Sequence, residues 1–130
     1  LRVRADLLRP WAHWITPAGE TRRYDTRFFT AAIPPGAVPR DVSGEADEAD
    51  WVSPAQALAE FESGTRPMLT PTRHTLERVA RHATVADVLA AAPTGPVGAV
   101  RPRLEREGEQ DIIVLPDGTR ERAPVRLRSR

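Results

Sequence analysis

Apolar and polar positions in the first third of the chain predict two antiparallel strands. The apolar segment Ala12–Thr16 predicts the first strand, and Thr16-Pro17-Ala18-Gly19 is a strong turn signal directly after it. Arg22–Ile33 predicts a longer second strand beside the first. Pro34-Pro35 ends this strand, because proline has no amide hydrogen to donate to a sheet.

A short strand, Trp51-Val52, is predicted to lead directly into a first helix. Ser53 caps this helix, Pro54 takes its first position, and Gln56 completes a capping box, in which two side chains bind free backbone amides of the first turn. Gly64 ends the helix. Its predicted apolar stripe consists of Ala55, Leu58 and Phe61.

Two further helices are predicted after the first. Thr70-Pro71 opens one of them, and Thr84 caps the other with Asp87 as its capping-box acid. His74 and His82 are placed on the second helix, away from its apolar face, and a surface position is favoured over a metal-binding one. The residues expected to face inward are Leu76, Val79, Ala80 and Ala83, then Val85, Val88, Leu89 and Ala92.

The last third of the chain predicts two or three strands. Val97–Leu104 is interrupted by Pro102 and is expected at the edge of a sheet. Asp111–Leu115 predicts a buried strand, and Pro116-Asp117-Gly118-Thr119 is a turn signal after it. Arg126–Arg130 is expected to be a frayed end.

The composition excludes several classes of protein. The chain has 130 residues, no lysine, no cysteine and a net charge of +1, without a block of like charge. The small net charge argues against nucleic-acid binding, and the lack of cysteine excludes disulfides and thiolate chemistry. No apolar run approaches the roughly 18–20 residues of a membrane span. We therefore expect one domain, or part of one, located in the cytoplasm.

The segment Arg23–Phe29 gives the most informative pattern of the chain. In an extended strand, its three charged side chains point to one face, and the three residues that alternate with them point to the opposite face. A strand face with this charge is either a solvated edge, which alternation alone favours, or the floor of a site for an anionic ligand. His13, on the preceding strand, could face the same site. The charged face consists of Arg23, Asp25 and Arg27, and the other face of Tyr24, Thr26 and Phe28.

Acidic residues are concentrated in the predicted loop that follows, between Arg40 and Asp50. Carboxylates near the end of a sheet are the ligands that hard ions such as Mg²⁺ prefer, and such an ion holds phosphate oxygens. A solvated acidic loop is the alternative, and the spacing alone favours it. The chain has neither a glycine-rich phosphate loop nor a serine in a nucleophile context. The acidic residues are Asp41, Glu45, Asp47, Glu48 and Asp50.

Several motifs occur in a defined order over nearly the whole chain. The most specific are Trp14-Ile15-Thr16-Pro17, then Arg23–Phe29 with the sequence Arg-Tyr-Asp-Thr-Arg-Phe-Phe, and Leu69-Thr70-Pro71-Thr72. Less specific are Trp51-Val52-Ser53-Pro54 after the acidic loop and the late strand Ile113-Val114-Leu115-Pro116. Together they resemble the Nudix hydrolase family, in the branch of the peroxisomal-type acyl-coenzyme A diphosphatases and their actinobacterial relatives.

The resemblance implies an α/β fold, a Nudix-like α/β/α sandwich with a mixed sheet, of which this chain would be the carboxy-terminal portion. Residues 1–92 would then be the carboxy-terminal part of a Nudix hydrolase domain, and residues 93–130 a β-rich extension. The glutamate-rich Nudix box, which supplies the main metal ligands of the family, has no match here. We expect a fragment of a longer protein, inactive by itself.

The resemblance also implies a chemistry for the full-length parent. It would use Mg²⁺ or Mn²⁺ to activate water for attack on the pyrophosphate bond of a nucleotide-type substrate, in the first place coenzyme A or acyl-coenzyme A. Glu45 and Glu48 both match a late loop glutamate that serves the family as an extra metal ligand or catalytic base. Arg23 and Arg27 are candidates for phosphate contacts, with Asp25 holding them by paired hydrogen bonds.

Alternatives to each of these assignments stay open. Arg23, Asp25 and Arg27 could form an ion-pair cluster without a ligand. The chain could also be a catalytically inactive Nudix-like module that binds a nucleotide or a protein, or a purely structural domain. As partner we expect a small-molecule nucleotide diphosphate, with neither nucleic acid nor membrane, and the sequence leaves a homodimer open.

Overall fold

The computed structural model describes residues 4–38 and 50–124. Within these residues the chain forms two small sheets and three α-helices, so its α/β character is confirmed. The elements in chain order are η1 (Ala5–Leu7), β1 (Arg9–Ile15), β2 (Asp25–Thr30), α1 (Pro54–Glu62), α2 (Thr70–Val79), α3 (Val85–Ala90), β3 (Ala99–Val100), β4 (Arg103–Glu107), β5 (Gln110–Val114) and β6 (Arg120–Arg122).

The first sheet is mixed and has the strand order β2-β1-β3. Strands β1 and β2 are antiparallel, as predicted, with a register shift between Pro10 and Ala12. Strand β2 ends at Thr30, three residues before the predicted end, and β1 begins three residues before its predicted start. Strand β3 lies parallel to β1, which makes β1 the central strand.

The second sheet contains β4, β5 and β6, with β5 in the centre and both of its neighbours antiparallel. The predicted strand Asp111–Leu115 is confirmed as β5, and Gly118 donates its amide hydrogen to the Leu115 carbonyl in the turn that follows. Pro102 separates β3 in the first sheet from β4 in the second, at the place where the sequence predicted an interruption.

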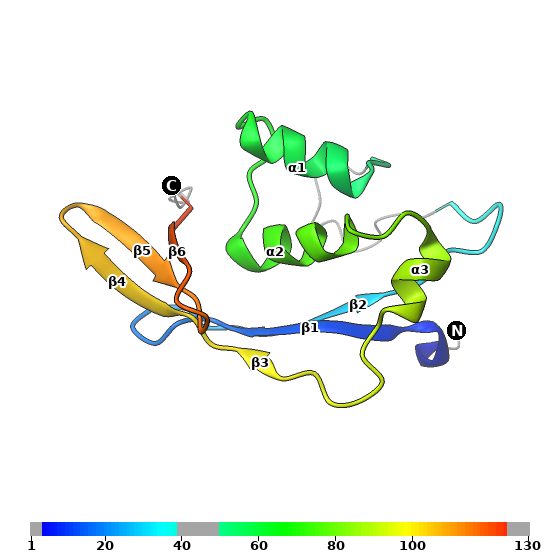
Figure 1. Ribbon diagram of the computed structural model, residues 1–130, viewed down its shortest axis with the longest axis horizontal. Helices are drawn as coiled ribbons and strands as arrows, with labels where there is room; N and C mark the ends of the chain where they lie inside the picture. Colours follow the sequence, from blue (N-terminus) through cyan, green and yellow to red (C-terminus); the bar gives the residue numbers. More distant parts are fainter. Residues whose placement is uncertain (1–3, 39–49, 125–130) are drawn as a thin grey trace.

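All three described helices lie on the same side of the first sheet, with α2 next to β1 and α1 outside α2 (Figure 1). The second sheet lies at the end of β1 away from α3 (Figure 1). The part of the chain that the structure describes therefore contains one helical layer over a mixed sheet. The second helical layer of the expected sandwich has no counterpart within it.

The helix starts follow from capping. The Ser53 hydroxyl accepts a hydrogen bond from the Gln56 amide, and in α3 the Thr84 and Asp87 side chains form the complete, predicted capping box. The capping box predicted for α1 is wrong, because the Gln56 side chain donates to Glu60 one turn further on. The strand predicted at Trp51-Val52 is also wrong: these residues form no strand, and Trp51 is 74% exposed.

The core lies between β1 and the helices. Trp11 is 1% exposed and is the largest fully buried side chain, and Trp14 is 6% exposed. Leu115, directly after β5, is packed into the same cluster and joins the second sheet to it. The rest of this cluster consists of Ala12 and Ala92, with Phe28, Val79, Val88, Val100 and Ile113 packed against it.

The two helical histidines, which the sequence predicted at the surface, are half-buried and pack against the tryptophans of β1. His82 follows the end of α2 and meets Trp11 edge-on, with 5.9 Å between ring centroids. His74 lies against Trp14, with 5.5 Å between ring centroids. Both imidazoles extend the aromatic packing around β1, a use of histidine that helical periodicity alone does not reveal.

The predicted division at residue 92 stays a prediction. Two contacts cross it: β3 pairs with β1 in one sheet, and Leu115 packs in the core with Trp11.

Helix α1 is tied to the segment after it by Glu60. Its carboxylate accepts hydrogen bonds from Arg66 Nε at 2.6 Å and Gln56 Nε2 at 2.9 Å. Arg66 also binds Asp50 at 2.8 Å, which connects the two ends of α1. These bonds hold the pKa of Glu60 below its ordinary value, with Arg66 as the largest cause and Gln56 the next.

We predict that Leu115→Ala lowers the free energy of unfolding by about 2–5 kcal/mol, because it leaves a cavity where the second sheet meets the core. Chemical denaturation with a common m-value measures this change. Leu69→Ala is the matched control, since Leu69 is 65% exposed, and it should change stability by about 0.5 kcal/mol or less. Equal losses in the two variants would contradict the assigned role of Leu115.

We predict a pH-dependent effect of Glu60→Gln on stability. A carboxylate whose pKa is lower in the folded than in the unfolded chain stabilises the fold above its ordinary pKa, here 4.5, and loses this contribution as the pH falls. The difference in unfolding free energy between the parent and Glu60→Gln should therefore be largest above about pH 5 and decline below it. A difference that stays constant between about pH 7 and pH 3 for Glu60→Gln would refute the prediction.

Candidate functional site

Thr16 joins two of the sequence motifs at the end of the β1–β2 hairpin. Its amide donates to the Tyr24 carbonyl at 3.0 Å, and its hydroxyl accepts from the Tyr24 amide at 2.9 Å. Arg23 Nε donates to the Thr16 carbonyl at 3.2 Å. These bonds satisfy the backbone groups just beyond Ile15 and Asp25, the last paired residues of β1 and β2, and they fix the position of Tyr24 beside β1.

A cleft of about 330 Å³ opens next to this hairpin end, and we call it the Trp14 cleft. It lies where the first sheet, the start of α2 and the second sheet meet. Its lining comes from all three specific motifs and from β5. The residues are Trp14, Ile15, Thr16 and Pro17; Glu20, Arg22, Tyr24 and Thr26; Leu69, Thr70 and Pro71; and Pro102, Ile113, Ala123 and Pro124.

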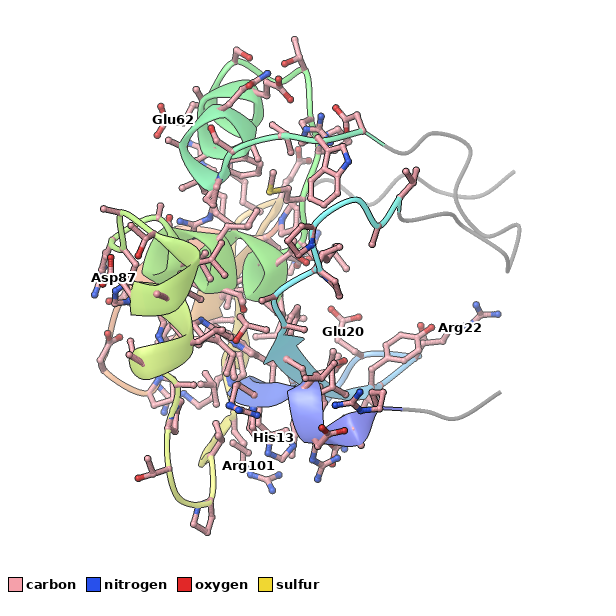
Figure 2. The ribbon with its side chains drawn as sticks, turned by 90° about the vertical axis from the view of Figure 1, so that its right-hand side faces the viewer. His13, Glu20, Arg22, Glu62, Asp87 and Arg101 are labelled. Carbon is pink, nitrogen blue, oxygen red and sulfur yellow. The ribbon has the colours of Figure 1, made fainter. Side chains whose placement is uncertain are left out.

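The walls of the Trp14 cleft are mostly apolar. Trp14 is buried, whereas Tyr24 is 61% exposed at the opening. Polar groups are few: the hydroxyls of Thr16, Thr26, Thr70 and Tyr24, and the charged Glu20 and Arg22 on the loop between β1 and β2 (Figure 2). A cleft of this size and composition suits the apolar part of a small molecule, with a few polar groups to orient it.

Behind the cleft, a polar network fastens α2 to β6. Arg73 donates to both Glu77 and Glu121, and His74 Nε2 lies 3.2 Å from Glu121 Oε2. His74 Nδ1 lies 3.4 Å from Glu77 Oε2, so the imidazole bridges two carboxylates while it stacks on Trp14. Glu121 is the most buried member, with 16% of its side chain exposed. The network therefore supports the wall of the cleft from the side of the second sheet.

The charged residues of β2 lie on the other face of the strand. Asp25 Oδ1 is 2.9 Å from Arg27 Nη1 and 2.7 Å from His13 Nε2, so one oxygen serves both. Arg27 and Asp25 are thus paired, as predicted, and His13 joins them. The predicted pairing of Asp25 with Arg23 is wrong, because Arg23 instead binds the Thr16 carbonyl before β2 begins.

The predicted metal ligands lie outside the described residues: Glu45 and Glu48 fall between residues 39 and 49. Of the same loop, Asp50 is described and pairs with Arg66. In residues 4–38 and 50–124, no group of three or more histidine or acidic side chains is arranged to hold a metal ion. The described side chains therefore do not by themselves fit Mg²⁺ or Mn²⁺.

Among the described helices, none combines the length and apolar character that crossing a membrane requires.

One comparison with known proteins gives a match. A segment of 85 residues, 62% of this chain, is 34% identical to human acyl-coenzyme A diphosphatase NUDT19, of which it covers 22%. The chain thus spans about a fifth of the length of this relative. No protein-family profile matches the chain, and neither does any solved structure. The similarity supports a relationship to the Nudix family, and the resemblance seen in the motifs is confirmed to that extent.

The Trp14 cleft and the Glu121 network were not predicted from the sequence. The motifs themselves were the available signal, because residues from three separate motifs line one cleft. Nothing in the local pattern around Glu121 indicates its pairing with Arg73, 48 residues earlier. Only the packing of β6 against α2 brings the two together.

We predict that Glu121→Gln lowers the free energy of unfolding by about 1.5–3 kcal/mol, because it weakens charge-assisted hydrogen bonds to the half-buried Arg73 and His74. Denaturant titration measures the change. Glu107 pairs with Arg120, but its side chain is 60% exposed. Glu107→Gln should therefore lower the free energy of unfolding by only about 0–1 kcal/mol. A Glu121→Gln variant as stable as Glu107→Gln would show that the network does not fasten α2 to β6.

Proposed function

We propose that this chain is the carboxy-terminal part of a Nudix-type hydrolase that cleaves the pyrophosphate bond of a nucleotide-type substrate, coenzyme A or an acyl-coenzyme A. Two observations support the proposal. One is the similarity to a human acyl-coenzyme A diphosphatase. The other, which carries most weight, is that residues from three separated motifs line one cleft.

The composition of the Trp14 cleft suits part of such a substrate. Coenzyme A has a long, weakly polar arm that bears the thiol or acyl group, and a nucleotide half with several phosphates. The apolar walls around Trp14 and Ile113 would take the arm, and Tyr24 at the opening would cover it. Hydrolysis of the pyrophosphate would release an adenosine bisphosphate and an acyl-phosphopantetheine.

The phosphates require positive charge, which we assign to Arg23 and Arg27. Arg23 lies at the hairpin end beside Thr16, and Arg27 lies on the face of β2 away from the helices. Strand β2 is an edge strand of the described sheet, so an extended substrate can pass around it. Asp25 would orient Arg27 through the bond at 2.9 Å.

A divalent cation, Mg²⁺ or Mn²⁺ as in Nudix enzymes generally, would activate the water and offset negative charge on the pyrophosphate. Glu45 and Glu48 are proposed as a metal ligand or base from this chain. The main metal ligands would come from a Nudix box in the parent protein. This chain's own described residues would bind and orient the substrate.

We predict that the full-length parent, with Mn²⁺, releases an adenosine bisphosphate from acyl-coenzyme A, and that replacing both Glu45 and Glu48 by glutamine lowers kcat by on the order of 10²-fold or more. Chromatography of the nucleotide products measures both effects. The double change Glu107→Gln and Glu109→Gln, on the β4–β5 hairpin, is the control and should leave kcat unchanged.

Two outcomes would contradict parts of this proposal. Unchanged kcat in the Glu45 and Glu48 double variant would remove this loop from the mechanism. Nucleotide binding without any product would instead favour the alternative, a catalytically inactive Nudix-like binding module.

A further inference from the structure

The face of the first sheet away from the helices gathers positive charge from three strands or their ends. His13 of β1 pairs in register with Ala99 of β3, and paired residues point to the same face of a sheet. Arg101 follows Ala99 by two residues and returns to that face. Its neighbours confirm the alternation, because Val100 packs against the core and Pro102 is buried in the wall of the Trp14 cleft.

Arg101 and His13 lie close to each other on this face. Figure 2 shows both side chains on the side of β1 away from the helices. The strand spacing and rise place their Cα atoms roughly 8 Å apart, within the reach of an arginine side chain. Among the residues that the structure describes, Arg101 has no ion-pair or hydrogen-bond partner, and it is exposed.

The charges on this face do not cancel. Asp25 is shared between Arg27 and His13 through one oxygen, at 2.9 and 2.7 Å. Arg101 adds a second guanidinium, so two positive charges face one carboxylate. The arginines also keep donors that Asp25 does not use, since a guanidinium carries five N–H groups and only one Arg27 bond to Asp25 is formed. The cluster can therefore accept an anion.

A cavity of about 450 Å³ adjoins the cluster and gives such an anion room. His13 and Arg27 are its two charged or titratable lining residues, and Phe29, Pro96 and Val97 are among the apolar ones. Apolar walls lower the effective dielectric constant around the bound charge, which strengthens its attraction to the arginines. The cavity is also large enough for the group that carries the anion.

We propose that Arg27, Arg101 and His13 form a binding site for a phosphate monoester, with Asp25 orienting two of them. Arginine suits this group because its planar guanidinium can form paired hydrogen bonds to phosphate oxygens. The ribose 3′-phosphate of coenzyme A is such a monoester, and its assignment as the ligand rests on the proposed function. Arg101 thereby becomes a residue that distinguishes substrates with this phosphate from those without it.

Binding of adenosine 3′,5′-bisphosphate and of adenosine 5′-monophosphate to the full-length protein, measured by calorimetry, tests the site without any need for activity. Arg101→Gln should weaken binding of the bisphosphate about tenfold, the loss expected for one charge-assisted bond. Binding of the monophosphate should not change. The affinity of Arg101→Lys for the bisphosphate should lie between those of the parent protein and Arg101→Gln. Arg122→Gln is the matched control, because Arg122 is an exposed arginine of β6 without a partner among the described residues.

A kinetic comparison separates this inference from the proposed function. Arg101→Gln should raise KM for coenzyme A about tenfold and leave KM for its 3′-dephospho form unchanged. Turnover with equal KM values in the parent and Arg101→Gln would overturn the phosphate site and leave the hydrolase intact. If the parent protein shows no hydrolase activity and Arg101→Gln still selectively weakens binding of the bisphosphate, the phosphate site would be supported and the proposed function refuted. Equal weakening by Arg122→Gln would also overturn the site.

Discussion

Burial of Trp11 and Trp14 in β1 is the interaction on which the rest of the described structure depends. These two indoles lie in the central strand, so β2 and β3 pair on either side of them and the helices lie over them. The side chains of α2 and its C-terminal end then pack on them directly: His74 on Trp14, and His82 and Arg78 on Trp11. Leu115 brings the second sheet to the same core.

This arrangement gives β1 and β2 two faces with different chemistry. On the helix side, residues of the three specific motifs, Trp14 among them, form an apolar cleft with a few hydroxyls. On the opposite side, His13, Asp25 and Arg27 form a charged cluster beside a second cavity. The alternation of a strand separates the two environments by only one residue, since Thr26 lies between Asp25 and Arg27. A ligand with an apolar arm and a phosphate-bearing end can use both.

The local elements could be predicted from the sequence because their signals lie within a few residues. Ser53, Thr84 with Asp87, and Pro102 marked element boundaries that the structure confirms. Likewise, Arg27 and Asp25 pair within one strand face. The Glu121 network and the approach of Arg101 to His13 could not be predicted, because they depend on how segments far apart in the sequence pack. The Gln56 side chain had two possible partners, the backbone amide of Ser53 in a capping box and the carboxylate of Glu60. It binds Glu60, which comes within reach only once the helix has formed.

Pro102 has a consequence for how the Trp14 cleft adapts to its contents. It connects the two sheets and lacks an amide hydrogen, so the hydrogen-bonded ladder of β3 cannot continue unbroken into β4. The backbone between β3 and β4 therefore joins the two sheets as a single covalent link. The contacts of Glu121 and Leu115 hold the second sheet in place on its other side. Because Ile113 of the second sheet and Trp14 of the first both line the cleft, a shift of the second sheet would change the shape of the cleft. Substitutions of Leu115 or Glu121, which do not line the cleft, can thus alter which molecules fit into it.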